Sequence, residues 1–322
     1  MVYKPIVIVA GEPNSIFSEI LIKSLKYKKF KSPIILIASK NLFKLQLKKL
    51  NVDRKIRLIK FSDLKSKSLD NKKINLINVT YDQKKAFDKI SSKSNNYIKR
   101  SFNIALKILN KRITNKFING PISKKFFLNK KYLGITEYLA HKTKTKNFAM
   151  LIYNKRLSVC PLTTHLPIKK VSKKINKKMI KEKVELIDSF FKKHFNYRPV
   201  MAITGLNPHC ESTDKYNEDE KIICPSIKSL TKSNFKIFGP FAADTLFLKN
   251  NRRRYNVIIG MYHDQVLTPI KTLFEYDSIN ITLGLPFLRI SPDHGPNEKM
   301  IGKNKSNPLS LINAIKFLDF KK

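Results

Sequence analysis

Short apolar runs rich in β-branched residues alternate with amphipathic stretches along the whole chain. Three of the apolar runs are "PIVIVA" at 5–10, "PIILIAS" at 33–39 and "YNVIIGMYH" at 255–263. Between such runs lie segments like "NNYIKRSFNIALKILNKRI" at 95–113, in which apolar residues recur three and four positions apart, as in a helix with one buried face. Strands that alternate with helices predict an α/β fold with a largely parallel sheet.

The size and cysteine content narrow the class of protein further. A chain of 322 residues with 42% hydrophobic residues predicts two domains or one large α/β unit. The N-terminal "MVYKPIVIVAGEP" lacks the features of a signal peptide, and no apolar run approaches the ~18 residues of a membrane span. Cys160, Cys210 and Cys224 are odd in number and lack CxxC spacing, which argues against a disulfide framework or a thiolate zinc site. We therefore expect a cytoplasmic protein with no membrane association.

The formal net charge of +42 is the unusual feature of the composition. Only ten of the 65 basic residues are Arg, and Lys is spread over the whole length instead of forming one footprint. Proteins that read DNA sequence use Arg forks in a localised patch, and the only short Arg cluster is "RRR" at 252–254. We interpret the charge as a compositional drift toward Lys, Asn and Ile, and expect no specific nucleic-acid partner.

Histidines follow three separate apolar runs. His165 ends "LSVCPLTTH", His209 ends "PVMAITGLNPH" and His263 ends "YNVIIGMYH". In open α/β sheets, ligands bind at the carboxyl ends of the strands, and neutral imidazole is a common metal ligand. A shared divalent-metal site and three unrelated, solvent-facing histidines are both compatible with this pattern. Nearby carboxylates that could complete a site are Asp244, Asp264 and Glu211.

A second polar set surrounds the run "SINITLGLPFLRI" at 278–290. Lys271, Asn280 and Arg289 combine a point charge, an amide and a guanidinium fork, which suits an anion such as a phosphate. Spacing alone leaves open whether they form an anion clamp or are three separate surface residues.

Six ordered segments resemble those of the 4-hydroxythreonine-4-phosphate dehydrogenase family: "GITEYLA", "TTHLPI", "TGLNPHCE", "GPFAADTLF", "YHDQVLTPIK" and "INITLGLPFLRISPDHG". The likeness runs from "GEPNSIFSEI" to "NPLSLINAI", nearly the whole chain. It implies an α/β fold similar to isocitrate and isopropylmalate dehydrogenases, with two α/β/α domains and the active site in the interdomain cleft. We expect residues 1–130 and 285–322 to form the first domain and residues 131–284 the second, with the metal ligands and the dimer contacts. The family is homodimeric, with a metal site that draws on both subunits.

The resemblance also implies roles for individual residues. His165, His209 and His263 would bind a divalent cation (Zn, Mg or Co), and Asp244 and Lys271 would take part in catalysis. Thr136, Lys271, Asn280 and Arg289 would contact the phosphorylated amino-acid substrate. NAD or NADP would lie against the loop that contains His294, Gly295, Gly302 and Asn307. The implied reaction oxidises 4-phosphohydroxy-L-threonine to a β-keto acid that decarboxylates to 3-amino-2-oxopropyl phosphate, in pyridoxal 5′-phosphate biosynthesis.

The chain departs from the family pattern at three places. Ile135 stands where the family has a substrate-contacting His, and Phe17 stands where it has a Gly. The loop after "DHG" contains Pro296, Asn297 and Glu298 in place of small residues. Two alternatives therefore stay open: a related oxidative decarboxylase of threonate or erythronate phosphate, and a non-catalytic basic binding protein.

Overall fold

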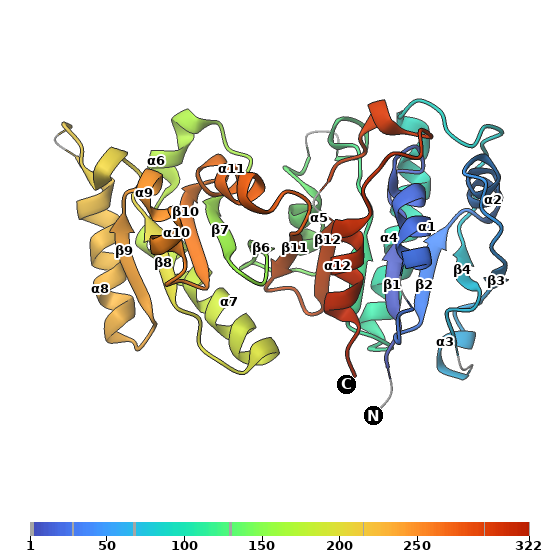
Figure 1. The fold of residues 1–322 in the computed structure, drawn as a ribbon, viewed down its shortest axis with the longest axis horizontal. Helices are drawn as coiled ribbons and strands as arrows, with labels where there is room; N and C mark the ends of the chain where they lie inside the picture. Colours follow the sequence, from blue (N-terminus) through green and yellow to red (C-terminus); the bar gives the residue numbers. More distant parts are fainter. Residues whose placement is uncertain are drawn as a thin grey trace. The chain divides into compact units, whose positions relative to one another are not determined.

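The computed structural model describes residues 3–27, 29–66, 69–128, 131–214, 216–292 and 294–321. The chain divides into two compact units: unit 1 comprises Met1–Leu139 and Pro286–Lys322, and unit 2 comprises Ala140–Leu285 (Figure 1). The boundary after Leu139 lies nine residues beyond the one expected after residue 130. The boundary after Leu285 lies one residue beyond the one expected after residue 284. The assignment of metal ligands and dimer contacts to the second domain stays a prediction.

Unit 1 is built on six strands, which are β1 (Ile6–Val9), β2 (Ile34–Ala38), β3 (Ile56–Leu58), β4 (Ile74–Asn78), β5 (Lys116–Asn119) and β12 (Leu288–Pro292). Its helices are α1 (Phe17–Tyr27), α2 (Lys40–Lys49), α3 (Asp63–Ser66), η1 (Ser92–Ser94), α4 (Asn95–Asn110), η2 (Lys124–Leu128), α5 (Ile135–Lys142, which continues into unit 2), η6 (Glu298–Met300) and α12 (Leu309–Leu318). The strand order is β3-β4-β2-β1-β5-β12, and each neighbouring pair is parallel.

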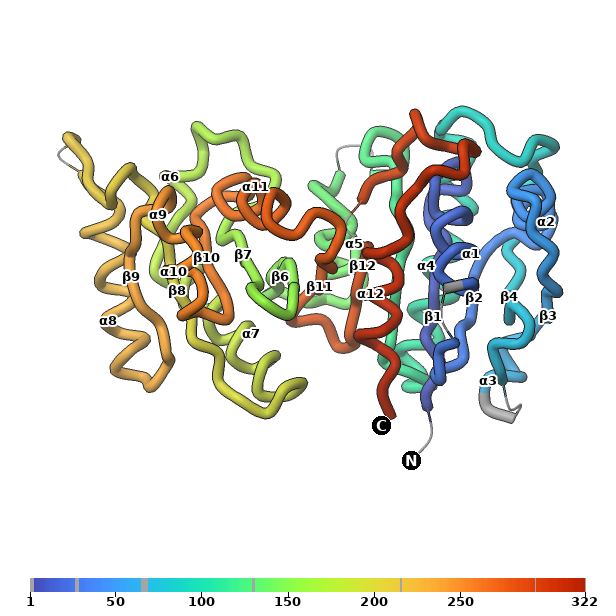
Figure 2. Tube along the Cα trace, in the orientation of Figure 1, coloured from blue at the N-terminus to red at the C-terminus, as the bar shows by residue number. Residues whose placement is uncertain are grey.

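The central strands of unit 1 are buried on both faces. All four residues of β1, Ile6–Val9, are fully buried, although successive side chains of a strand point to opposite faces. Helix α4 packs on β1, β2 and β5, and α12 packs on β5 and β12 and against α1. The C-terminal segment, in red, thereby lies beside the N-terminal elements, in blue (Figure 2). Continuous apolar runs are thus explained by helices that cover both faces of a parallel sheet.

Unit 2 contains the strands β6 (Ala149–Tyr153), β7 (Ser158–Thr163), β8 (Met201–Thr204), β9 (Ile237–Phe241), β10 (Val257–Tyr262) and β11 (Ile279–Leu283). Its helices are η3 (Ile168–Lys170), α6 (Val171–Lys174), α7 (Lys177–Phe195), η4 (Pro208–Cys210), η5 (Asp219–Ile223), α8 (Cys224–Lys232), α9 (Ala243–Leu246), α10 (Lys249–Arg252) and α11 (His263–Phe274). The strand order is β11-β6-β7-β10-β8-β9.

The unit 2 sheet is mixed, whereas the sequence predicts a largely parallel one. Strand β6 is antiparallel to both β11 and β7, and the remaining neighbours are parallel. Only residues 154–157 separate β6 from β7, and so short a connection forms a hairpin, because parallel strands need a long crossover. The α/β fold class expected from the sequence is confirmed. None of the helices within the described ranges has both the length and the apolar character that a membrane span requires.

Candidate active site

A buried arginine organises one candidate binding site in unit 1. Arg289 lies on β12, opposite Phe117 of β5, and is fully buried. Its Nε donates to Oδ1 of Asn119 at 2.7 Å, and its Nη1 donates to Oγ1 of Thr136 at 3.2 Å. Burial lowers the pKa of Arg289 to about 10, while the opposite charge of Glu137 raises it. The guanidinium therefore stays cationic at neutral pH and is held in one orientation.

Glu137 belongs to this site, although sequence reasoning did not select it. It follows Thr136 in the first turn of α5, and its Oε2 is buried without a hydrogen-bond partner among the described residues. A carboxylate oxygen that is cut off from water normally finds a donor, so this atom marks a place where a ligand donor is missing. The signal was the Glu that directly follows the Thr in "GITEYLA". Asn119 was likewise missed, and its signal was the Asn that ends "FIN".

Ile135 is the first residue of α5 and is half-buried. The structure thus places an aliphatic side chain next to Thr136, where the family has a His. An aliphatic side chain can neither donate a hydrogen bond nor carry charge.

Two of the residues expected to form the anion clamp lie in unit 2. Asn280 is the second residue of β11, opposite Ile152 of β6, and its Oδ1 is buried without a hydrogen-bond partner in the described part of the chain. Lys271 lies in the last turn of α11 and is half-buried. The convergence of both residues with Arg289 stays a prediction.

The three expected metal ligands follow neighbouring strands. Strand β10 pairs in parallel with β7 on one side and β8 on the other, so the carboxyl ends of all three strands lie at one edge of the unit 2 sheet. His165 comes just after β7, His209 lies in the turn after β8, and His263 directly follows β10 as the first residue of α11. The three histidines that were selected because each follows a strand therefore all lie along the same edge of the unit 2 sheet.

The structure brings two of these histidines together. The ring centroids of His165 and His263 are 5.7 Å apart, and Nδ1 of His263 lies 2.6 Å from Oδ1 of Asp264. His165 and His209 are exposed. Within the described residues, no group of three or more His, Cys, Asp or Glu side chains surrounds a common point where a metal ion would bind. The three-histidine ligand set remains a prediction, although its donor chemistry suits a divalent metal.

The backbone at this edge is strained. His165 has a φ of 50°, His209 a φ of 55° and Cys210 a φ of 64°. Left-handed backbone costs a residue with a Cβ roughly 1–2 kcal/mol, and such outliers concentrate at functional sites. The strain supports the hypothesis that this edge has a function.

Asp244 lies near the His209–Cys210 turn. It is exposed in the first turn of α9, and its carboxylate accepts from the backbone N–H of Thr245 at 2.8 Å. Burial, then the charge of Asp219, and more weakly that of Asp244, raise the pKa of the Cys210 thiol. Asp244 is therefore close enough to the turn to act electrostatically on it, and its catalytic role stays a prediction.

The expected cofactor loop lies in unit 1 and is fastened to α1. Glu19 Oε1 accepts from the backbone N–H of Ser306 at 2.6 Å and from Nζ of Lys23 at 2.8 Å. The same Lys23 ammonium donates to the carbonyls of Asn304 and Ser306 at 3.0 and 2.9 Å. Further along the chain, Asn307 Oδ1 accepts from the backbone N–H of Leu309 at the start of α12. These contacts fix the end of the loop through the buried Glu19 and the partly exposed Lys23.

The beginning of this loop has a more open geometry. Nδ1 of His294 lies 3.0 Å from the carbonyl oxygen of Gly295, and the space around Gly295 is open to a side chain. Gly302 has a φ of 71°, a conformation that favours glycine, and faces the ring of Phe87. The cofactor-binding role of these residues stays a prediction.

Glu12 is a buried carboxyl group in the segment after β1 that sequence reasoning also missed. It is 1% exposed and accepts from Ser94 Oγ at 2.9 Å and from the backbone N–H of Asn14 at 3.3 Å. Burial raises the pKa of Glu12 to about 7; the two hydrogen bonds oppose that shift and the charge of Glu298 adds to it. The backbone N–H of Ile16 donates to the carbonyl of Pro296 at 3.2 Å, so the segment after β1 contacts the expected cofactor loop.

Comparisons with known proteins identify the family of the chain. The family model described as "Pyridoxal phosphate biosynthetic protein PdxA" matches residues 29–318. The 4-hydroxythreonine-4-phosphate dehydrogenase of Sulfurihydrogenibium sp. is 37% identical over 313 residues, which are 96% of this chain and 95% of that protein. The D-threonate 4-phosphate dehydrogenase of Pectobacterium atrosepticum is 34% identical over 185 residues, 57% of either chain.

A solved structure shows the same fold over nearly the whole length. The crystal structure of 4-hydroxythreonine-4-phosphate dehydrogenase from Klebsiella pneumoniae superimposes with a TM-score of 0.83 at 27% sequence identity, and the alignment covers 98% of both chains. The resemblance expected from the sequence motifs is confirmed. The chain belongs to the PdxA family of pyridoxal phosphate biosynthetic proteins.

Proposed function

We propose that this chain is an NAD(P)-dependent dehydrogenase that oxidises 4-phosphohydroxy-L-threonine. The observation that carries the proposal is the buried, cationic Arg289, which is oriented by Asn119 and Thr136 at the matching family position. A desolvated guanidinium with a fixed fork suits a phosphate or carboxylate of the substrate. The name of the relative that matches 96% of the chain supports the same substrate.

The proposed reaction has two steps, an oxidation and a decarboxylation, and consumes one NAD(P)⁺ for each substrate molecule. With NAD(P)⁺ bound, the secondary alcohol of the substrate would lose a hydride and a proton, and the products would be a β-keto acid, NAD(P)H and H⁺. This acid then loses CO₂ and yields 3-amino-2-oxopropyl phosphate. The nicotinamide supplies the hydride acceptor, and a divalent cation supplies Lewis acidity at the substrate hydroxyl.

The residues of the chain bind and orient the reactants. Arg289 and Thr136, with Lys271 and Asn280, would hold the substrate, and the buried Oδ1 of Asn280 offers an acceptor for a substrate N–H or O–H. Glu137 places negative charge beside Arg289 and could accept from a substrate ammonium. The loop fastened by Glu19 and Lys23 would carry the cofactor.

His165, His209 and His263 would hold the divalent cation, Zn, Mg or Co, with Asp244 close to the His209 turn. The exposure of His165 and His209, and the lack of a complete ligand cluster among the described residues, fit a site that a second subunit completes. We therefore include a homodimer with a shared metal site in the proposal.

The test measures NAD(P)H formation together with bound metal. Purified protein is assayed by absorbance with 4-phosphohydroxy-L-threonine, D-threonate 4-phosphate and D-erythronate 4-phosphate, with NAD⁺ and NADP⁺ in turn. We expect the highest kcat/KM with 4-phosphohydroxy-L-threonine and loss of activity after chelation. A higher kcat/KM with either sugar acid would contradict the proposed substrate, and activity with none of the three would support a non-catalytic binding protein.

The second candidate substrate rests on one specific observation. Ile135 occupies the position of a family His, and the relative that acts on D-threonate 4-phosphate matches more than half of the chain. The sugar-acid phosphates carry a hydroxyl where 4-phosphohydroxy-L-threonine carries an ammonium group, so a pocket without this His offers different partners to a substrate that also differs in its polar groups. The three-substrate comparison distinguishes the two candidates.

A further inference from the structure

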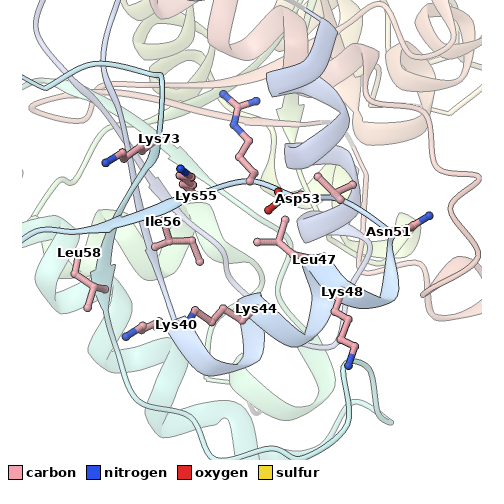
Figure 3. A pocket seen from close by; sticks show the side chains of 12 residues that line it. Lys40, Lys44, Leu47, Lys48, Asn51, Asp53, Lys55, Ile56, Leu58 and Lys73 are labelled. Carbon is pink, nitrogen blue, oxygen red and sulfur yellow. The ribbon is translucent and has the colours of Figure 1, made fainter.

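A basic groove lies at the edge of the unit 1 sheet, between α2 and β3. It has a volume of about 870 Å³, and its basic residues are Lys40, Lys44, Lys48, Arg54, Lys55 and Lys73 (Figure 3). We call it the α2–β3 groove. Strand β3 is the edge strand of this sheet, so the groove lies where the sheet ends. None of the six residues belongs to the candidate active site.

Three of the lysines form one stripe along α2. Lys40, Lys44 and Lys48 are four residues apart, so their side chains lie above one another on one face of the helix. At 1.5 Å per residue the stripe spans roughly 12 Å. Figure 3 shows these three lysines along the helix, with Lys55 and Lys73 on the neighbouring segments.

The neighbouring segments extend the stripe into a charged surface. Lys55 and Lys73 stand directly before the paired residues Ile56 and Ile74, so the two lysines are neighbours across the β3–β4 pair. Both are exposed. The groove thereby presents ammonium groups from three separate elements toward solvent.

The charge of this groove is not balanced by acidic neighbours, unlike that of another lysine-rich helix. On α7, Lys178 pairs with Glu182 and Lys181 pairs with Glu185. For Lys40, Lys44 and Lys48 the described part of the chain contains no ion pair, and the one acidic residue of the groove lining is Asp53. A groove with six cations and one carboxylate attracts anions more strongly than a helix with paired charges.

The chemistry of the lining selects the kind of anion. The described lining residues include no aromatic side chain, so unpaired bases have nothing to stack on. The guanidinium of Arg54 donates to the carbonyls of Leu25 and Asn71 and is not available to read base edges. Five lysine ammonium groups remain, and they act as point charges that suit phosphates.

We propose that the α2–β3 groove binds the phosphate backbone of duplex nucleic acid without sequence preference. A duplex carries one negative charge per about 1.7 Å of its axis, and backbone binding to it needs neither base stacking nor base readout. The binding is driven by release of counterions and falls steeply with salt. It is an activity separate from the dehydrogenase reaction.

Two triple variants with equal loss of charge test the proposal. The groove variant is Lys40→Gln/Lys44→Gln/Lys48→Gln, and the control on α7 is Lys177→Gln/Lys178→Gln/Lys181→Gln. Gln is a good helix former, so both helices should stay intact, which circular dichroism checks. Affinity for a short fluorescent DNA duplex is measured by anisotropy at several salt concentrations.

We expect the groove variant to bind at least ten-fold more weakly and to reduce the salt slope by about 2 to 3, since each lost phosphate contact removes about 0.9. The control variant should lose less than about three-fold. Equal losses in both variants would show that the charge acts as a whole, and would overturn the groove assignment. Dehydrogenase activity should be unchanged in both variants.

Competition experiments test the nature of the occupant. Inorganic polyphosphate and single-stranded DNA are added at equal phosphate concentration to the labelled duplex complex. We expect the unlabelled duplex to compete best. Stronger competition by polyphosphate or by single-stranded DNA would overturn the assignment of a duplex as the occupant.

Discussion

Arg289 of unit 1 and the three histidines of unit 2 are both candidate ligand-binding groups, but their surroundings differ. Arg289 is fully buried, and two side chains fix its guanidinium. His165 and His209 are exposed and stand on left-handed backbone, and His263 has a side chain that is 35% exposed. The arginine is buried and oriented by contacts within the protein, whereas two of the three histidines face the outside.

This difference has a physical basis. A guanidinium can be buried only where other groups satisfy its donors, so the fold must build its binding site in advance. Neutral imidazoles tolerate exposure and acquire their geometry when a metal and further ligands arrive. We expect changes at the histidines to affect metal content and activity, and changes at Arg289 to affect substrate binding and folding.

The largest effect is expected at the histidine edge. His209→Ala should abolish activity and remove most bound divalent metal while leaving the fold intact, because His209 is exposed. Metal is measured by elemental analysis of purified protein, and the fold by circular dichroism. Unchanged metal content in His209→Ala would refute the assignment of this residue as a ligand.

Mixing two inactive variants sharpens the same comparison. If His209 and His263 reach a common metal from different subunits, His209→Ala and His263→Ala should complement each other. Random exchange gives heterodimers with one intact site, and activity should recover to about a quarter of the wild-type value. No recovery after verified subunit exchange would place both ligands in one chain.

The next largest effect is expected at Arg289. Loss of a desolvated, charge-assisted contact costs about 2–3 kcal/mol, so Arg289→Ala should lower kcat/KM on the phosphorylated substrate by roughly 30- to 150-fold. Arg289→Lys keeps the charge but loses the fork, and should recover part of this loss. Thermal melts of both variants separate binding from folding. Equal wild-type activity on phosphorylated and unphosphorylated hydroxythreonine would show that no phosphate clamp exists.

Burial also shifts the pKa of an acidic residue of unit 1, Glu12, as it shifts that of Arg289. Its pKa is raised to about 7, so the folded state holds a proton that the unfolded chain releases above its ordinary value of 4.5. The stabilising contribution of this proton is complete below pH 4.5 and is lost as the pH rises through about 7. The loss should be on the order of 2–3 kcal/mol, and Glu12→Gln should remove it.

Urea denaturation of wild type and Glu12→Gln at pH 5 and pH 8 measures this contribution. The matched control is Glu185→Gln, which changes an exposed carboxylate on α7. The control should keep the pH dependence of the wild type. The same pH dependence in Glu12→Gln would mean that Glu12 ionises normally in the folded protein.

The sequence predicted the fold class and the common edge of the three histidines because both follow from local patterns. Parallel strands place their carboxyl ends together, so His165, His209 and His263 could be grouped from strand ends alone. The antiparallel direction of β6 was not predicted. The four residues that link β6 to β7, "NKRL", lack the Asn-Gly or Asp-Gly pair that marks a hairpin turn in a sequence.

Long-range contacts could not be derived from the sequence. Asn119 and Arg289 are 170 residues apart, and Glu12 and Ser94 are 82 apart, so no periodic pattern links them. The burial of Glu12 and Glu137 was missed for a similar reason, because acidic residues next to a strand or a helix start are usually solvated. Such partners depend on how distant segments pack, which the sequence pattern does not encode.

The smallest effect is expected at Ile135, which borders the preformed Arg289 site. Asn119 and Thr136 each accept a hydrogen bond from Arg289, so the proposed substrate-binding guanidinium is already oriented without a His at 135. Ile135→His should then change KM for 4-phosphohydroxy-L-threonine by less than about five-fold, because one added hydrogen bond is worth about 0.5–1 kcal/mol. Kinetics of both proteins on the three phosphorylated acids measure this change in KM.

A large gain in activity on 4-phosphohydroxy-L-threonine, with a loss of activity on a different acid that the wild type prefers, would show that residue 135 sets the substrate preference. That result would move the preferred substrate to a sugar acid while leaving the comparison between the buried arginine and the exposed histidines unchanged.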